Sequence, residues 1–252
     1  MVFVMAGTGE GLGLAQALVR HGLNPTVSVV TADGARPFQQ NGIPVRVGAL
    51  ERPALVGVLR ACGARVLVDA THPYATGAHE TARQAAMAAG IGLIRLQRPG
   101  IDGEAYPVHW VDGHEQAARL ARSRGGVVFL ATGGQTLLRY GLAFAVAPPV
   151  SFVVRLLPTR DNLLRCEQLG LPPDRIYAMK GPFPPSLNLA LYQHAHARVL
   201  VTKDGHAQDG PDKIAPALAL GMEVIVVRRP AGAGLATVSD VVAACLKAAE
   251  TW

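Results

Sequence analysis

Short apolar runs and helical patterns alternate along nearly the whole chain. In the first hundred residues, runs rich in valine, isoleucine and leucine cover residues 2–7, 26–31, 44–48, 65–70 and 92–96. The apolar spacing between them predicts helices near residues 11–21, 52–62 and 74–89. Continuous apolar strands that alternate with helices are typical of βαβ units around a buried parallel sheet. This part of the chain is therefore expected to form a parallel-sheet α/β domain.

A turn-rich break at residues 97–100 interrupts this alternation, which then resumes. Further strands are predicted at 108–111, 126–132, 151–157, 175–181, 197–205 and 223–230, and helices at 114–124, from near Gly134, and at 238–249. The fold class is thus predicted to be α/β, with two doubly wound Rossmann-like parallel-sheet domains and a cleft between them. We expect the first domain to comprise residues 1–97 and the second residues 98–252.

Composition narrows the class of protein. The 252 residues are 50% apolar and 17% charged, which excludes a disordered chain. No apolar run approaches the ~18 residues of a membrane span, and the N-terminus lacks a basic, apolar leader, so a cytoplasmic protein is expected. The scattered Cys62, Cys166 and Cys245 are predicted to be small buried hydrophobes. His194 and His196 are expected on a surface helix, where alternate positions do not share a face, so no metal site is predicted.

The net charge of +6 is carried mostly by arginine. The arginines are dispersed, and even the densest group, Arg119, Arg122 and Arg124, has no interleaved aromatic residues. This pattern argues against a nucleic-acid partner and favours a small polyanionic ligand, because guanidinium groups pair well with carboxylates and phosphates. The composition leaves the oligomeric state open, and it is compatible with a monomer.

A glycine-rich loop follows the first predicted strand and precedes a helix. It consists of Gly7, Thr8, Gly9, Glu10 and Gly11. Glycines let the backbone approach a pyrophosphate, and the following helix offers N–H groups and the positive end of its dipole. The G-x-G-x-x-G fingerprint is not met, because Leu12 stands at the third glycine position. We expect the loop to hold a nucleotide, and the loop alone leaves NAD, NADP and S-adenosylmethionine open.

The end of the second strand favours one of these nucleotides. Enzymes that bind NAD or S-adenosylmethionine usually have an acidic residue there for the ribose hydroxyls. Here Asp33 lies beyond the strand end, whereas Thr31 and Arg36 supply a hydroxyl and a guanidinium. These groups suit a 2′-phosphate. The cofactor is therefore predicted to be NADPH.

The fourth strand is followed by Thr71-His72-Pro73-Tyr74. Pro73 suits the first turn of the next helix, and Thr71 could cap that helix. Neither argument explains the polar-tipped rings of His72 and Tyr74, which are expected beside the glycine loop. We predict that Thr71, His72 and Tyr74 line the cofactor, and a contact with the substrate is the alternative.

In the second domain, similar turns follow two strands. The residues expected to bind substrate are Thr132, Gly133, Gly134, Thr202, Lys203, Gly205 and Arg228. Their backbone N–H groups and cations can hold an anion. Lys203 and Asp204 are predicted to be catalytic, since an adjacent cation and carboxylate can hold an anionic substrate and donate a proton. The alternative is a surface ion pair that contributes little to stability.

Six motifs taken together are similar to one known family. "GTGEG" at 7–11, "DATHPYA" at 69–75, "RPG" at 98–100, "ATGG" at 131–134, "TKDG" at 202–205 and "VIVVRRP" at 224–230 resemble, in this order, the precorrin-6A reductases of cobalamin biosynthesis. The resemblance spans nearly the whole chain. It implies two Rossmann-like domains, the first for NADPH and the second for substrate. It also implies reduction of one double bond of precorrin-6A to give precorrin-6B, with neither metal nor flavin.

The sequence departs from the family after Lys203-Asp204. The family commonly continues with a serine-glycine turn, whereas here His206 and Asp209 follow, and their roles stay open. The proton donor also stays open among Lys203, Asp204 and a water molecule. There are three alternatives to the predicted function. The first is the cobalt-precorrin-6A reductase of the anaerobic route, with NADPH or NADH as its cofactor. The others are a non-catalytic NADP(H)-binding module and a methyltransferase, which the end of the second strand disfavours.

Overall fold

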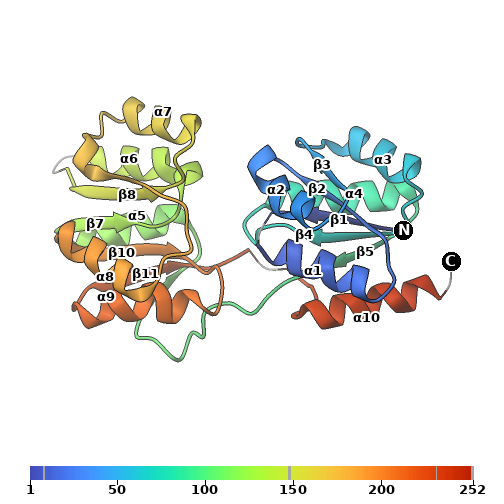
Figure 1. The fold of residues 1–252 in the computed structure, drawn as a ribbon. Coiled ribbons are helices and arrows are strands. Elements are labelled where there is room, and N and C mark those ends of the chain that lie inside the picture. The colour runs from blue at the N-terminus through green and yellow to red at the C-terminus, as the bar shows by residue number, and fades with distance from the viewer. Residues whose placement is uncertain (8, 147–148, 231, 251–252) are drawn as a thin grey trace. The chain divides into compact units, whose positions relative to one another are not determined.

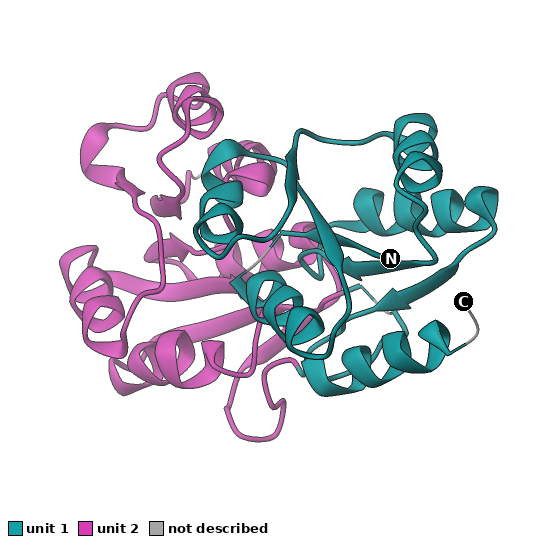
Figure 2. Cartoon of the chain, turned by 45° about the vertical axis from the view of Figure 1, so that its right-hand side comes forward, with its two compact units in different colours: residues 1–99, 230–252 teal, residues 100–229 magenta. Residues whose placement is uncertain are grey.

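The computed structural model describes residues 1–7, 9–146, 149–230 and 232–250. The chain forms two compact units (Figure 2). Unit 1 comprises residues 1–99 together with 230–252, and unit 2 comprises residues 100–229. In both units every strand pairing is parallel. The predicted fold class, two α/β units with parallel sheets, is therefore confirmed.

Unit 1 is built on a sheet of five strands in the order β3-β2-β1-β4-β5 (Figure 1). The strands are β1 (Val2–Ala6), β2 (Pro25–Val29), β3 (Val45–Val47), β4 (Val66–Ala70) and β5 (Gly92–Arg95). The helices are α1 (Gly9–Arg20), α2 (Ala32–Gln40), α3 (Arg52–Ala61), α4 (Thr76–Ala89) and α10 (Val238–Ala249). Successive side chains of β1 enter different cores: Val2 and Val4 pack with α1 and α10, and Phe3 packs with α3 and α4. Helices thus cover both faces, which explains why the central strand β1 is apolar at every position.

The C-terminal segment belongs to unit 1. Helix α10 packs against α1 and β5 (Figure 1), and it buries Val241, Val242 and Cys245 in the unit 1 core. The segment before it is tied to β5 by a backbone hydrogen bond of 2.8 Å from Leu235 N to Arg95 O. The expected second domain of residues 98–252 is corrected accordingly. Amphipathic periodicity predicts the helix, but it does not specify which sheet the apolar face covers.

Unit 2 is built on a sheet of six strands in the order β6-β11-β10-β7-β8-β9. They are β6 (His109–Val111), β7 (Val127–Leu130), β8 (Phe152–Leu156), β9 (Ile176–Ala178), β10 (Ala197–Lys203) and β11 (Glu223–Val227). The helices are α5 (His114–Arg124), α6 (Leu137–Ala145), α7 (Arg160–Gln168), α8 (Pro185–His194) and α9 (Ala215–Ala219). Short helical turns at Gly134–Thr136, Pro173–Arg175 and Gly210–Ile214 complete the unit.

Each strand overlaps an apolar run predicted from the sequence, whereas several helices do not follow from apolar periodicity. Helix α2 contains Pro37, α7 is mostly polar, and α9 is only five residues long. Helix α8 ends at His194, and His196 lies beyond it with φ of 49°, so the expected shared helix is corrected. The described residues contain no group of metal-ligating side chains, and none of their helices is long and apolar enough to cross a membrane.

The strand order places one topological switch point in each sheet. In unit 1 the chain runs outward from β1 through β2 to β3, and β4 and β5 lie on the other side. In unit 2, β8 and β9 extend from β7, and β11 extends from β10 in the opposite direction. Ligands of open α/β sheets bind at the carboxyl ends of the strands where the order reverses. The carboxyl ends of β1 and β4 in unit 1, and of β7 and β10 in unit 2, are therefore the expected ligand-binding edges.

Candidate functional site

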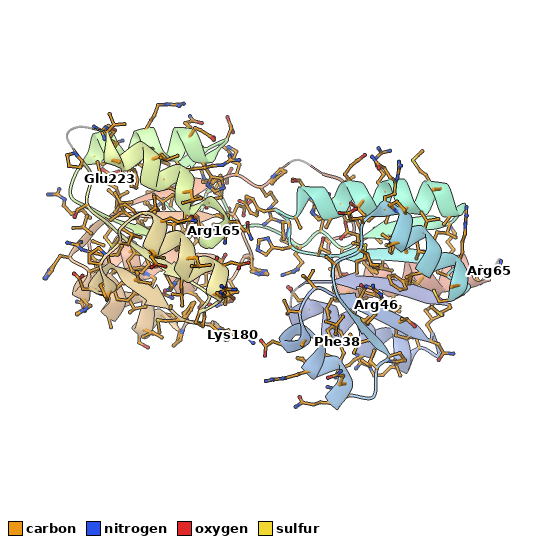
Figure 3. The ribbon with its side chains drawn as sticks, turned by 90° about the horizontal axis from the view of Figure 1, so that it is seen from above. Phe38, Arg46, Arg65, Arg165, Lys180 and Glu223 are labelled. Atoms are coloured by element: carbon orange, nitrogen blue, oxygen red, sulfur yellow. The ribbon has the colours of Figure 1, made fainter. Side chains whose placement is uncertain are left out.

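The turn between β1 and α1 is very short, because β1 ends at Ala6 and α1 begins at Gly9. A Cβ on Gly11 would lie 2.7 Å from the Cβ of Ala6 and 3.7 Å from Cζ of Phe38. Phe38 belongs to α2 and is labelled in Figure 3. Gly11 thus allows α1 to approach β1, which is the role of the third glycine in dinucleotide-binding loops. This explains why Leu12 is tolerated at the nominal third position. Thr8 lies outside the described residues.

The rest of the loop is open, and it lies beside the end of β4. A Cβ on Gly9 would meet no atom of the described residues within 4 Å. A Cβ on Gly7 would lie 3.6 Å from both Thr71 Cα and His72 N. The structure therefore brings together the glycine loop and the Thr71-His72 segment, as the sequence predicted. The first N–H groups of α1 have no partner within the helix, so this edge offers donors to an anion.

Glu10 is held by a cation. Its Oε2 forms an ion pair with Nη1 of Arg98, whose side chain is only 12% exposed. The negative charge of Glu10 at the start of α1 is therefore compensated. In the sequence Arg98 stands out only as part of the "RPG" motif, and its pairing with Glu10 is evident only from the fold.

Thr31 lies in the connection between β2 and α2, and Arg36 lies in α2 itself. The Thr31 hydroxyl caps α2 by accepting a hydrogen bond of 3.1 Å from Gly34 N. Arg36 lies in α2, where its guanidinium is 3.6 Å from Asp33 Oδ1 and its side chain is 74% exposed. An exposed ion pair of this length contributes little to stability. Arg36 is therefore accessible, and its contact with Asp33 is weak enough to be exchanged for another anion.

A buried network that the sequence analysis missed anchors the end of β4. Asp69 is 2% exposed, and its Oδ1 accepts hydrogen bonds from the Thr71 hydroxyl at 2.6 Å and from Thr71 N at 3.1 Å. Its Oδ2 lies 2.6 Å from Nδ1 of His79. Burial raises the pKa of Asp69, but the hydrogen bonds from His79 and Thr71 outweigh it and leave the pKa below its ordinary value.

Arg95 and Pro73 contact the other nitrogen of His79. Nη2 of Arg95 lies 2.9 Å from His79 Nε2, and the Pro73 carbonyl oxygen lies 3.3 Å from the same atom. The ring is therefore held from both sides, with Nδ1 facing Asp69. His79 and Arg95 also line a pocket of about 710 Å³ in unit 1. A buried aspartate at a strand end, followed by a histidine in the next helix, was the sequence signal for this network.

The same network determines the conformation of residues 71–75. Helix α4 begins at Thr76 with Ala75 at its N-cap, so Thr71 is not a helix cap and Pro73 precedes the first turn. His72 Nδ1 accepts a hydrogen bond of 3.3 Å from Tyr74 N, and the two rings lie 5.7 Å apart. The local expectations for Thr71 and Pro73 are thus corrected, while the segment remains at the predicted edge.

In unit 2 the turn after β7 lies beside the end of β10, because Ala131 N donates to Val201 O at 2.9 Å. Thr132 is buried, and its hydroxyl accepts from Thr136 at 3.0 Å. Gly133 has φ of 80°, which favours glycine, and a Cβ on Gly134 would collide with the side chain of Asn162. These glycines are therefore required by a turn and by close packing.

Thr202 is 1% exposed, and its Oγ1 has no hydrogen-bond partner among the described residues. A side chain buried to this extent presents no accessible surface to a ligand. The structure thus gives no support to Thr202 as a binding residue, although its neighbours on β10 lie at the edge.

Lys203 ends β10 at the switch point. Burial, with the nearby charge of Lys213, lowers its pKa from the ordinary value. Lys203 in turn affects His114, whose pKa is lowered to about 4, mainly by burial and then by Lys203 and Arg139. His114 Nδ1 also lies 2.9 Å from the buried Tyr140 hydroxyl. No local pattern in the sequence distinguishes His114, because its partners are distant in the chain.

Asp204 is buried and held by three donors. Arg229 donates from Nε to Oδ2 at 2.8 Å and from Nη2 to Oδ1 at 3.1 Å, and Ile101 N donates to Oδ1 at 2.9 Å. This bidentate pair joins the ends of β10 and β11 to the start of unit 2. Asp204 was expected either to be catalytic or to form an exposed surface ion pair. Its buried, bidentate pair with Arg229 matches neither expectation. The structure therefore favours a structural role for Asp204.

The turn after Asp204 is organised by Asp209. A Cβ on Gly205 would collide with the Asp209 carboxylate, which explains the glycine there. Asp209 Oδ1 lies 2.8 Å from Lys213 Nζ, and Oδ2 accepts from His206 N at 3.3 Å. Asp209 thus has a structural role that the sequence had left open.

Arg228 follows β11 with a half-exposed side chain. Its Nε lies 3.3 Å from Asp112 Oδ1, and its guanidinium stands 5.1 Å from the centre of the Trp110 ring. The ion pair is with the exposed Asp112 carboxylate and contributes little, so the half-exposed Arg228 remains accessible to an anion.

Comparison with known proteins identifies one family whose match covers both ligand-binding edges. Residues 1–246 match the model of the family described as precorrin-6x reductase CbiJ/CobK. The chain is 33% identical to a cobalt-precorrin-6A reductase of Priestia megaterium over 91% of both chains. It is 30% identical to a precorrin-6A reductase of a Sinorhizobium species, covering 95% of this chain and 88% of that one.

A solved structure supports the same assignment. The CobK precorrin-6A reductase superposes with a TM-score of 0.78 at 25% identity, and the match covers 98% of this chain and 96% of that chain. The resemblance drawn from the six motifs is thus confirmed by sequence and by fold. The chain belongs to the precorrin-6x reductase CbiJ/CobK family.

Proposed function

We propose that this protein reduces one double bond of precorrin-6A with NADPH, giving precorrin-6B in cobalamin biosynthesis. The observation that carries the proposal is the extent of the family match, which spans residues 1–246 and therefore both switch points. Family membership supports an oxidoreductase that acts on a precorrin. The choice of NADPH and the roles of individual residues are argued from the two edges.

Unit 1 is the proposed cofactor-binding unit. Gly7, Gly9 and Gly11, with Thr8, are assigned to the diphosphate, because the space at Gly9 is open and α1 starts there. The ion pair with Arg98 compensates the charge of Glu10 beside an anion, and Glu10 is assigned with the loop to the same ligand. Thr71, His72 and Tyr74 flank the loop and are assigned to the same ligand. When bound, NADPH supplies the hydride.

The preference for NADPH over NADH is assigned to Arg36 in α2 and to Thr31, which caps that helix. Arg36 is exposed, and its guanidinium can exchange the contact with Asp33 for a 2′-phosphate. The Thr31 hydroxyl, which uses its oxygen to cap α2, still has its proton to donate.

Unit 2 is the proposed substrate-binding unit. Gly133 and the cations Lys203 and Arg228 complement the carboxylates of a tetrapyrrole. The buried Thr132 and Gly134 shape the turn that presents Gly133, and Gly205 gives room to the Asp209 carboxylate. Reduction of a carbon–carbon double bond needs a hydride at one carbon and a proton at the other. We assign the proton to Lys203 Nζ, because burial lowers its pKa and makes its ammonium a better acid.

A second candidate substrate is cobalt-precorrin-6A. It is favoured by the 33% identity to the Priestia megaterium protein of that name, against 30% to the Sinorhizobium precorrin-6A reductase. The cobalt would belong to the substrate and requires no ligands from this chain.

One assay tests the function and separates these candidates. Purified protein is mixed with each macrocycle and with NADPH or NADH, and loss of the reduced-nicotinamide absorbance is followed. We expect turnover with NADPH, and the faster macrocycle identifies the substrate. If the protein binds NADPH but the absorbance stays constant with both macrocycles, the protein is a cofactor-binding module and the proposed reductase activity is wrong.

A further inference from the structure

Unit 2 contains a pocket that is lined mostly by residues other than those predicted from the sequence to bind the substrate. Its volume is about 440 Å³, and it opens at the carboxyl ends of β7, β8 and β9. Its walls include Leu157, Met179 and Phe183, and the segment 206–213 closes one side. Of the residues assigned above to the substrate, only Gly133 lines it.

The pocket contains a buried arginine. Arg155 of β8 is 6% exposed, and its guanidinium lies against Phe183, 4.2 Å from the ring centre. Its Nη1 donates to Asn188 Oδ1 at 2.5 Å. Within the described residues no carboxylate forms an ion pair with Arg155. A guanidinium carries five N–H donors and stays protonated even where burial lowers its pKa, as it does here.

The groups that favour the charged form of Arg155 are the Tyr192 hydroxyl and, after it, the Asp209 carboxylate. Asp209 is already engaged, because its Oδ1 is 2.8 Å from Lys213 Nζ. Asp212 accepts from the Gln208 amide at 3.0 Å. Burying a charge without a direct counter-ion is costly, so a cation retained in this way indicates an anion that enters from outside.

The shape of the pocket indicates the class of anion. Its apolar walls suit a short aliphatic arm, and the Asn188 contact and the Phe183 ring hold the guanidinium plane in position. A carboxylate pairs with such a plane through two parallel hydrogen bonds. Building on the proposed function, we propose that Arg155 binds a carboxylate on a side arm of the tetrapyrrole and so determines how the macrocycle is seated in unit 2.

The test compares binding of the two reactants. Arg155→Gln removes the charge and keeps an amide that can reach Asn188, and Arg119→Gln, on the exposed face of α5, removes an equal charge elsewhere in unit 2. We expect the KM for the tetrapyrrole to rise about 10- to 100-fold in Arg155→Gln, with the KM for NADPH unchanged and Arg119→Gln like the wild type. Arg155→Lys should raise the tetrapyrrole KM less, because lysine keeps the positive charge but lacks the paired N–H donors of the guanidinium.

A second pair of variants leaves the buried charge in place. Leu157, 50% exposed, lies in the wall of the pocket, so Leu157→Glu should also raise the KM for the tetrapyrrole, and the neutral Leu157→Gln should not. An unchanged tetrapyrrole KM in Leu157→Glu and in folded Arg155→Gln would overturn the inference and leave the proposed function standing. A rise confined to the NADPH KM would show that the pocket takes a cofactor phosphate instead. Absence of turnover by the wild type would refute the proposed function, and this inference with it.

Discussion

The carboxylate of Asp69 and the imidazole of His79 meet at 2.6 Å, and this contact joins the end of β4 to the first turn of α4. The same carboxylate holds the hydroxyl and the backbone N–H of Thr71. One buried acid therefore determines the conformation of the segment that lies beside the glycine loop. Its substitution should affect both stability and cofactor binding.

Asp69→Asn is expected to lower the free energy of unfolding by about 2–3 kcal/mol, because an amide nitrogen then faces donors on His79 or Thr71. Urea titration measures this loss, and a cofactor titration should show weaker NADPH binding. Asp33→Asn, at an exposed carboxylate, serves as the control and should change stability by less than about 0.5 kcal/mol. Equal stability of the two variants would contradict the assigned role of Asp69.

The half-buried His114 makes stability depend on pH. Its pKa is about 4 in the folded protein, against an ordinary value of 6.5, so the unfolded chain binds the proton more tightly. Its contribution to stability is complete above 6.5 and declines as the pH falls toward 4. After allowance for solvent screening, the loss is on the order of 1–2 kcal/mol. Chemical denaturation across this range measures it, and His114→Gln should flatten the profile.

Asp69 acts at lower pH. Its folded pKa lies below the ordinary value of 3.8, so its stabilising contribution is present above 3.8 and disappears as the pH falls through the lowered pKa. Asp69→Asn should therefore alter the acid limb below the His114 transition. If that variant changed the profile only near neutral pH, the assignment would be wrong.

Two glycines of α1 provide a matched test of packing. Gly11→Ala places a methyl group 2.7 Å from Ala6 Cβ and is expected to cost about 1–3 kcal/mol of stability. A Cβ on Gly13 meets no described atom within 4 Å, so Gly13→Ala should stabilise the helix by about 0.5–1 kcal/mol. Thermal unfolding of both variants checks the prediction, which fails if they shift the midpoint in the same direction.

The proposed preference for NADPH is assigned to Arg36. Arg36→Ala should raise the Kd for NADPH by about 10- to 100-fold and leave NADH binding nearly unchanged, because only NADPH carries the 2′-phosphate. Calorimetric titration with both cofactors measures the difference. Arg20→Ala, at the far end of α1, is the control. Equal losses for the two cofactors would exclude Arg36 from the 2′-phosphate site.

Lys203 and Asp204 are adjacent in sequence but should behave differently. Lys203→Met is expected to lower kcat by about 10²- to 10⁴-fold with NADPH affinity unchanged, because the proton donor is lost. Asp204→Asn should mainly reduce stability, because it breaks the bidentate pair with Arg229. Steady-state kinetics and unfolding curves separate the two effects. A stable Asp204→Asn variant with the kinetic defect predicted for Lys203→Met would make Asp204 the donor.

The strands and the general position of both edges could be predicted from the sequence because their signals are local. Apolar runs such as 66–70 and 197–203 must be buried wherever they lie, and a polar residue directly after such a run lies at the carboxyl edge. Gly7, Thr71 and Lys203 were placed at these edges on that basis. The sequence could not assign roles to them, because a role depends on partners far away in the chain.

What the sequence by itself determined is therefore the parallel α/β class, the order of the motifs and the family they indicate. The tertiary structure decided which unit α10 joins, that Asp204 is tied to Arg229, and that Arg155 is buried without a paired carboxylate among the described residues. The physical reason is the same in each case. Apolar periodicity is set by neighbouring residues, whereas burial and charge pairing depend on contacts between residues that are distant in sequence and adjacent only after folding.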